Sequence, residues 1–458
     1  MLRNIAKVLM SNLIGTVIGL VNSIVFPIIL SIEGYAYYQQ FILYVSYINI
    51  CHLGIASGMF INYGGKAYED TDKSRYKSEM HLIFSVLAFF TSIGLAIFLF
   101  SGKELILAVA LSIFPVCLNA SFRAIYQAWN KFTEYSITNV LPNAMVTITI
   151  VLIFLIMGNV NRGLIIIVYL VSQYLVCSYF LLEYGKFVRG AKSAKMLSGE
   201  NMVTMKNGFL VTIGNYVNTL FHSIDKQFVN VLYSVHSFAM YSFAMSTQSM
   251  MTIFITALAQ PFYPKMARGD MNKKELNFLK ELLFMFGSLS GCAYFALSIV
   301  VKYFIKKYTG SLEVIGIFFA VFPAMAVINV IYINMYKIKR KLKKYVFVLL
   351  GMLGISIVFN GIAAVVHGGN IGISFATMCV YYVWLYYSQR DLEEITIGLK
   401  DTIYLVVYLG IYFSLTRVPN NIIGCVSYLV VIFIWDTVMY KSSVIELKDY
   451  VLEKIRTR

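Results

Sequence analysis

Long apolar runs are the feature that most constrains the fold of this chain. Runs of about 18 to 25 mostly apolar residues recur from one end of the sequence to the other, and a helix of that length can span a bilayer. Of the 458 residues, 59% are hydrophobic and only 13% are charged. A soluble globular protein has about half apolar and about a quarter charged residues. The sequence therefore predicts an all-α polytopic membrane protein.

Fourteen segments qualify as membrane-spanning helices by length and apolar character. They lie near residues 8–31, 36–62, 81–100, 105–129, 137–157, 163–183, 207–232, 236–262, 281–301, 313–336, 346–366, 371–388, 401–416 and 421–440. The first run has no convincing small-residue cleavage site and is followed by more spans, so we interpret it as a helix and not as a signal peptide. Segment 401–416 is short for a span. Twelve spans are therefore the alternative to fourteen.

The distribution of positive charge predicts the orientation in the membrane. If the N-terminus is cytoplasmic, 31 of the 38 lysine and arginine residues fall in inside segments. Outside segments hold only Lys103, Arg162, Lys302, Lys306, Lys307 and Arg417, and Lys226 lies within a span. This asymmetry follows the positive-inside rule and places both termini in the cytoplasm. It also explains the formal charge of +16 without a nucleic-acid partner.

The basic run KIKRKLKKY at residues 337–345 is the densest group of positive charges in the chain. One interpretation is a cytoplasmic anchor that fixes topology. The other is a site that binds anionic lipid headgroups. Both interpretations stay open at the level of sequence.

Polar and charged residues interrupt the seventh predicted span. Asn215, Asn218, His222 and Asp225 follow one another at spacings of three, four and three, which places them on one face of a continuous helix. An unpaired charge inside a membrane costs several kcal/mol, so such a face turns toward protein or a water-filled cavity. Partners of Asp225 and Lys226 are expected on other spans, because adjacent residues on a helix do not face each other. His222 could couple transport to protons or could simply be hydrogen-bonded.

Other spans carry milder polar faces. Asn12 and Asn22 lie in the first span, Asn119 and Arg123 in the fourth, and Asn139 in the fifth. These residues predict a shared central cavity, although amide side chains also form interhelical hydrogen bonds in any membrane bundle. The candidate substrate-binding residues are therefore Arg123, Lys226, Asp225, His222, Asn119, Asn215, Asn218, Asn12 and Asn22.

Motifs of several enzyme classes are missing from the sequence. A P-loop, HExxH, GxSxG and a glycine-rich dinucleotide loop after a strand do not occur. The six cysteines (Cys51, Cys117, Cys177, Cys292, Cys379 and Cys425) are scattered without CxxC or metal-ligand spacing. No connector is long enough for a catalytic domain, so we expect a transporter and not an enzyme. We expect neither a metal nor another cofactor, and coupling to H⁺ or Na⁺ stays open.

The side chains of the predicted cavity favour an anionic, sugar-containing substrate. Arg123 and Lys226 suit phosphate or an acidic sugar, since arginine can bind phosphate through two parallel hydrogen bonds. Phenylalanine and tyrosine total 68 residues, and those that face the cavity would offer flat surfaces to sugar rings. Residues 35–38 (YAYY) and 238–241 (FAMY) are similar to each other. This similarity indicates an internal repeat of two bundles.

Several stretches resemble the Wzx-type polysaccharide flippases of the multidrug/oligosaccharidyl-lipid/polysaccharide exporter superfamily. They are MSNLIGTVIGLVNSIVFPIIL (10–30), EGYAYYQQFILYVSYINICHLGIASGMFINYGGKAY (33–68), FRAIYQAWNKFTEYSITNVLPNAM (122–145), SIDKQFV (223–229) and QPFYPKMAR (260–268). The likeness covers most of residues 1–270. It implies two six-helix bundles around a cavity, which we place at residues 1–195 and 196–400, followed by an extra helix pair and tail at 401–458.

The resemblance also implies a function. Family members move undecaprenyl-diphosphate-linked oligosaccharide, such as an O-antigen repeat unit, from the inner to the outer leaflet of the bacterial plasma membrane by alternating access. We therefore expect this lipid-linked oligosaccharide, membrane lipids and other polysaccharide assembly proteins as partners, and no nucleic acid. A multidrug-type antiporter of the same superfamily and a membrane-embedded glycan polymerase or acyltransferase are the alternatives.

Overall fold

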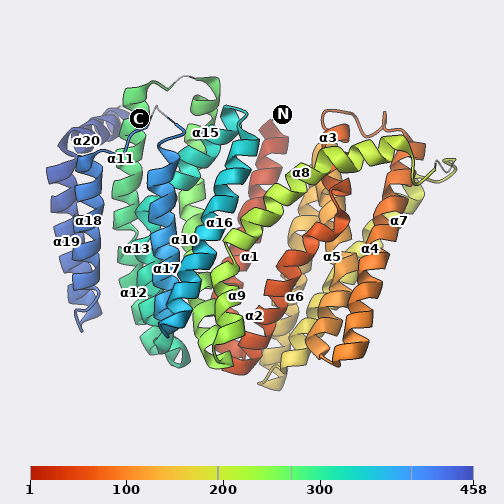
Figure 1. The fold of residues 1–458 in the computed structure, drawn as a ribbon, viewed down its shortest axis with the longest axis horizontal. Helices are drawn as coiled ribbons and strands as arrows, with labels where there is room; N and C mark the ends of the chain where they lie inside the picture. The colour runs from red at the N-terminus through yellow and green to blue at the C-terminus, as the bar shows by residue number, and fades with distance from the viewer. Residues whose placement is uncertain (1, 193–194, 270, 393–394, 457–458) are drawn as a thin grey trace. The chain divides into compact units, whose positions relative to one another are not determined.

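The computed structural model describes residues 2–192, 195–269, 271–392 and 395–456, and every regular element among them is helical (Figure 1). Eight helices are long and apolar enough to cross a membrane, or ten if each of two bent helix pairs counts as one span, among the residues described. The prediction of an all-α polytopic membrane protein is confirmed. The count of fourteen spans and the cytoplasmic location of the termini stay predictions.

The chain divides into two compact units, residues Met1–Ser223 and Ile224–Arg458. The bundles predicted from the sequence instead divide between residues 195 and 196. The difference arises because the helix after residue 198 packs on earlier helices of the first unit. The predicted domain limits, including the separate segment 401–458, stay predictions.

The described residues of unit 1 form eight α-helices. They are α1 (Leu2–Ile29), α2 (Ile32–Tyr47), α3 (Ile55–Tyr63), α4 (Lys73–Ser101), α5 (Glu104–Ala128), α6 (Phe132–Met157), α7 (Arg162–Phe187) and α8 (Gly199–Phe221), with a 3-10 turn at Ile48–His52 between α2 and α3. Helix α6 packs against α1, α5 and α7, and α5 also packs against α4. Helices α1, α5 and α6 therefore lie together and form the part of unit 1 in which the predicted Asn12 and Arg123 are found.

Helices α2 and α3 form a bent pair, because the chain changes direction at Leu53 and Gly54. Both residues have positive φ angles, 47° and 86°, and the two helices meet at 61°. A Cβ atom on Gly58 would lie 2.0 Å from the carbonyl oxygen of Thr204, and one on Gly208 would lie 2.0 Å from that of Gly54. The backbones of α3 and α8 thus touch, and only glycine fits at these crossing points.

In unit 2 the residues that the structure describes form twelve α-helices. They are α9 (Ile224–Leu232), α10 (Val235–Arg268), α11 (Lys273–Leu289), α12 (Cys292–Phe304), α13 (Leu312–Ala320), α14 (Phe322–Val327), α15 (Ile333–Ile338), α16 (Leu342–Val365), α17 (Gly369–Ser388), α18 (Leu399–Leu415), α19 (Asn421–Met439) and α20 (Lys441–Arg456), with a 3-10 turn at Lys306–Ser311 and a π turn at Ile328–Tyr332. The segment from the 3-10 turn to α15 bends by 47° between Ala320 and Phe322. Pro323 lies in the first turn of α14 after this bend, where its missing N–H leaves no helical hydrogen bond unmade.

Helices α18 and α19 are joined to α11 by buried polar contacts. Lys280 on α11 forms an ion pair with Asp401 at 2.6 Å, and the hydroxyl of Tyr440 donates to the other oxygen of Asp401 at 2.8 Å. Tyr404 donates to Asp436 at 2.7 Å and lies 2.9 Å from the hydroxyl of Ser288. The helix pair that the sequence treated as an extra appendage therefore packs as part of unit 2.

Candidate functional site

Arg123 lies in α5 of unit 1, where it contacts α6 and is linked through α6 to a side chain of α1. Its guanidinium donates to the Oδ1 of Asn139 at 3.3 Å. The Nδ2 of Asn139 in turn lies 3.4 Å from the Oδ1 of Asn12, which also accepts from the hydroxyl of Tyr135 at 3.1 Å. The structure thus brings two predicted residues, Arg123 and Asn12, into one polar cluster.

The local sequence explains how this cluster forms. Tyr135 and Asn139 are four residues apart in α6, so they lie on the same face of that helix. Gly15 of α1 has no side chain, and a Cβ there would lie 3.7 Å from the Nδ2 of Asn139, so α1 approaches α6 closely. We call Asn12, Arg123, Tyr135 and Asn139 the arginine cluster.

The arginine cluster leaves the guanidinium short of partners. Arginine carries five N–H donors, yet Arg123 makes one hydrogen bond and no ion pair among the residues that the structure describes. Its neighbours Asn139, Asn12 and Tyr135 are neutral. A cation held in this way can accept an anionic ligand without first breaking an internal ion pair.

Two further predicted residues of unit 1 make interhelical hydrogen bonds. Asn22 of α1 accepts from the hydroxyl of Thr147 on α6 at 2.7 Å. Asn119 is buried, and its Nδ2 donates to both the carbonyl and the side-chain oxygen of Gln173 on α7 at 3.0 Å. For both residues the structure shows the interhelical bonding that the sequence had left open as an alternative. Their role in binding stays a prediction.

Asn215, Asn218 and His222 belong to the end of α8 and not to the helix that carries Asp225. Helix α8 ends at Phe221, and α9 begins at Ile224. The prediction of one continuous helix with a single polar face is therefore wrong. The chain leaves the helix at His222 and Ser223, and the hydroxyl of Ser223 donates to the carbonyl of Thr219. The helical repeat that would place residues before and after this point on one face therefore does not continue across it. Asn215 and His222 are exposed, and Asn218 is half-buried.

Asp225 in α9 is the centre of a buried polar cluster in unit 2. Its Oδ2 accepts from the hydroxyls of Tyr241 on α10 at 2.9 Å and Thr377 on α17 at 3.2 Å. Its Oδ1 accepts from the backbone N–H of Lys226 at 2.7 Å. The expectation that Asp225 finds side-chain partners on other helices is thus confirmed.

Lys226 is also buried, with 8% of its surface exposed. Its Nζ lies 5.6 Å from the centre of the Phe238 ring, within the range of a cation–π interaction. Asp225 precedes it directly in the chain. Unlike Arg123, Lys226 therefore has an acidic neighbour in its own unit.

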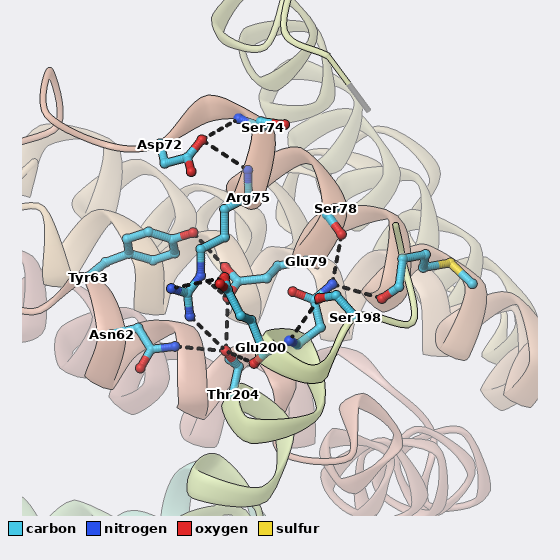
Figure 2. Close-up of polar contacts among 12 residues, drawn as sticks. Asn62, Tyr63, Asp72, Ser74, Arg75, Ser78, Glu79, Ser198, Glu200 and Thr204 are labelled. Carbon is cyan, nitrogen blue, oxygen red and sulfur yellow. Dashed lines mark hydrogen bonds and ion pairs between the residues drawn. The ribbon is translucent and has the colours of Figure 1, made fainter. Parts of the chain in front are cut away.

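Sequence reasoning missed Tyr135, Thr377 and a third cluster around Glu79 in unit 1, which Figure 2 shows. Glu79 of α4 is fully buried and accepts from the hydroxyls of Tyr63 and Thr204 at 2.5 and 3.0 Å. Its Oε1 pairs with Arg75 at 3.3 Å, and Arg75 also pairs with Glu200 at 3.6 Å. These residues join α3, α4 and α8. Glu79 was missed because the sequence placed it in a loop before the third span.

Within the described parts of the chain, no group of three or more histidine, cysteine, aspartate or glutamate residues could hold a metal ion. The polar clusters around Arg123 and Asp225 consist instead of amides and hydroxyls about a charged residue.

Comparisons with known proteins place this geometry in a family. A family profile described as "Polysaccharide biosynthesis protein" matches residues 1–270, which is more than half of the chain. No curated protein sequence matches significantly. Among solved structures, one titled "Lipid II flippase MurJ, inward closed conformation" aligns with a TM-score of 0.68 and 18% identity, covering 95% of this chain and 99% of that one.

A crystal structure of MATE in complex with Br-NRF aligns with a TM-score of 0.36 and 13% identity, covering 85% of this chain and 93% of that one. The similarity to the lipid II flippase shows that the fold is shared over nearly the whole chain. Together with the sequence match, it confirms the resemblance on which the expected family rested. This chain belongs to the polysaccharide biosynthesis protein family.

Proposed function

We propose that this protein is a flippase that moves a lipid-linked oligosaccharide across the membrane, with the phosphate of the substrate bound by Arg123. The observation that carries the proposal is the arginine cluster, in which one hydrogen bond to Asn139 is the only described polar contact of the guanidinium. A cation in a membrane helix costs several kcal/mol. Reversible binding of an anionic substrate would account for the presence of this cation in a membrane helix.

The family supports a saccharide substrate, and the fold supports transport. The matched profile is described as a polysaccharide biosynthesis protein, and the structure with the similar fold is named a lipid II flippase. We infer that the substrate is undecaprenyl-diphosphate-linked, with an O-antigen or similar repeat unit as its sugar. The polyprenyl chain would remain in lipid while the diphosphate and sugar pass through the polar interior of the protein.

Arg123 suits a diphosphate for a chemical reason. The planar guanidinium can donate two parallel hydrogen bonds to phosphate oxygens, and such charge-assisted bonds are worth about 1.5 to 3 kcal/mol each. Asn12 and Asn139 lie beside it and can bond sugar hydroxyls or the remaining phosphate oxygens. Lys226 is the second candidate for the phosphate, and the other predicted residues stay candidates for the sugar.

We further propose that the protein works in a bacterial plasma membrane by alternating access, moving the substrate from the inner to the outer leaflet. Coupling to an H⁺ or Na⁺ gradient is part of this proposal. Its test is transport into proteoliposomes with either gradient imposed or collapsed by an ionophore. Equal transport under all conditions would contradict coupling and leave the flippase proposal intact.

The central experiment compares variants in a strain that lacks the gene. Lipid-linked oligosaccharide in each leaflet and glycan at the surface are measured after complementation with the wild type, Arg123→Gln or Arg417→Gln. Arg417 is an exposed cation between α18 and α19 and serves as the matched control. We expect Arg123→Gln to reduce surface glycan about 100-fold, the loss of two charge-assisted bonds, while Arg417→Gln retains it.

The same assay distinguishes the rival functions. Accumulation of the lipid-linked unit on the cytoplasmic leaflet supports a flippase. If single units reach the outer leaflet but are never joined, the protein acts in polymerisation and the proposal is wrong. Normal surface glycan from Arg123→Gln, with the protein correctly inserted, would refute the assigned site.

A further inference from the structure

The turn between α15 and α16 carries an unusual density of positive charge. We call residues 337–344 the basic turn. It holds six basic side chains, of which Lys337, Arg340, Lys341, Lys343 and Lys344 are exposed and Lys339 is half-buried. A topology signal explains a positive charge on this side of the membrane, but it requires no particular arrangement.

The backbone of the basic turn matches that of the α5–α6 turn in unit 1. In the basic turn the N–H of Lys341 donates to the carbonyl of Tyr336 at 2.9 Å. In the α5–α6 turn the N–H of Lys131 donates to the carbonyl of Tyr126 at 2.8 Å. The two turns also share a tyrosine four residues after the lysine, Tyr345 and Tyr135. They are equivalent turns in the two units.

The equivalence shows that the fold does not need the extra cations. The α5–α6 turn makes the same geometry with Gln127, Asn130 and Thr133 at the positions of Lys337, Arg340 and Lys343. These six residues are related by a constant shift along the chain.

Position 340 gives the strongest evidence that the turn geometry alone does not account for the cations. Asn130 and Arg340 both have positive φ angles, 57° and 55°. Asparagine tolerates this left-handed conformation better than other non-glycine residues, so the backbone alone favours Asn at this point. Arg340 occupies it in spite of that preference, and residues held in such backbone conformations cluster at functional sites.

The negative charge near the basic turn is too small to neutralise it. Asp391, just after α17, pairs with Lys344 and accepts from the hydroxyl of Tyr336 at 2.7 Å. Burial raises the pKa of Asp391, but the hydrogen bonds from Lys344 and Tyr336 outweigh burial and hold that pKa below its usual value. By sequence alone, residues 337–344 and 390–394 together hold seven bases and three acids.

Apolar side chains continue from the basic turn along α16. Leu342, Phe347 and Leu350 are 52%, 72% and 43% exposed, and α16 is one of the helices long and apolar enough to span the membrane. Cations at the end of a span followed by exposed apolar groups match a phospholipid, whose phosphate lies at the interface and whose chains lie in the core. We propose that the basic turn binds the phosphate headgroups of anionic phospholipids of the surrounding bilayer. This proposal does not depend on the transported substrate.

The test exchanges the cations for their counterparts in unit 1. The variant Lys337→Gln, Arg340→Asn, Lys343→Thr keeps the turn geometry that α5–α6 demonstrates. The control variant Lys186→Gln, Arg189→Gln, Lys192→Gln removes three exposed cations of unit 1. Native mass spectrometry of the purified full-length protein measures binding of phosphatidylglycerol, phosphatidylcholine and undecaprenyl diphosphate.

We expect the wild type to bind phosphatidylglycerol more tightly than phosphatidylcholine, and the basic-turn variant to lose about tenfold or more of that affinity. The control variant should stay within about twofold of the wild type. Equal binding by the basic-turn variant and the wild type, or an equal loss in the control, would overturn the proposal. So would a wild type that ignores phosphatidylglycerol and binds only undecaprenyl diphosphate. If the triple variant does not insert, Arg340→Asn alone decides, with about a threefold loss expected and no loss refuting the site.

Discussion

Arg123 in unit 1 and Asp225 in unit 2 both make hydrogen bonds to neutral groups, but the two side chains are satisfied to different degrees. In unit 2 the carboxyl of Asp225 accepts three hydrogen bonds, at 2.7, 2.9 and 3.2 Å, and the residue is 4% exposed. In unit 1 the guanidinium of Arg123 makes a single described hydrogen bond, at 3.3 Å, to Asn139. A complete shell indicates a structural role, whereas an incomplete one indicates a place for a ligand.

The two units also differ at the position of Arg123 when their equivalent turns are aligned. The shift that relates the two turns puts Ile333 of unit 2 at the position of Arg123 in unit 1. A ligand that recognises the arginine cluster would therefore bind to unit 1 alone. Thus a repeat in backbone geometry does not require a repeat in function, and the variants below test each unit separately.

The largest effect is expected from Asp225→Ala. The substitution leaves the hydroxyls of Tyr241 and Thr377 and the backbone N–H of Lys226 without this acceptor in a buried environment. Removing one partner of such a buried network typically costs about 3 to 5 kcal/mol. We expect a clear loss of thermal stability in detergent, measured by unfolding of the purified protein. Unchanged stability together with lost transport would assign Asp225 to the transport site and abolish the contrast between the units.

Arg123→Lys tests whether unit 1 recognises geometry or only charge. Lysine keeps the positive charge but loses the planar pair of donors that matches phosphate oxygens. We expect transport into proteoliposomes to fall about tenfold, which corresponds to about 1.4 kcal/mol, with stability unchanged. Full activity of the lysine variant would show that the site needs a point charge and not a fork of hydrogen bonds.

Tyr135→Phe should produce a smaller loss in unit 1. It removes the hydroxyl that donates to Asn12 at 3.1 Å, and a net hydrogen bond is worth about 1 kcal/mol. We expect transport to fall about fivefold through a weaker apparent affinity, because Asn12 loses its orientation. The conservative comparison is Tyr169→Phe, a tyrosine of α7 outside the arginine cluster, which should leave transport unchanged. Equal losses in the two variants would show that Tyr135 acts only through packing.

The helices themselves could be predicted from the sequence because apolar length alone determines them. Each predicted span overlaps helical segments of the structure. The breaks could not be predicted in the same way. Hydropathy continues across Leu53 and Gly54, so that turn does not interrupt the apolar pattern. The polar residues around His222 and Ser223 predict one face of a continuous helix, although the helix ends there.

Some contacts of the candidate sites could be predicted from local spacing in the sequence, and others could not. Asn139 and Tyr135 could be associated from their four-residue spacing on one helix face. The bond between Thr377 and Asp225 joins residues 152 positions apart, and no local pattern contains that information. Glu79 illustrates a third case, since a carboxylate near a span end is usually solvated and only the packing of α3 and α8 buries it.

The smallest expected effect concerns pH and the equivalent turns. The lowered pKa of Asp391 means that its ion pair with Lys344 stabilises unit 2 above the usual aspartate pKa of about 4 and is lost as the pH falls through the lowered value. Because the side chain of Lys344 is 48% exposed, the contribution is only about 0.5 kcal/mol. We expect the unfolding temperature of the wild type to fall between pH 5 and pH 3, and that of Asp391→Asn to fall by less. The control variant Glu134→Gln, near the α5–α6 turn, should show the same fall as the wild type. If the unfolding temperature falls equally in the wild type and in Asp391→Asn, the ion pair between Asp391 and Lys344 does not stabilise the basic turn.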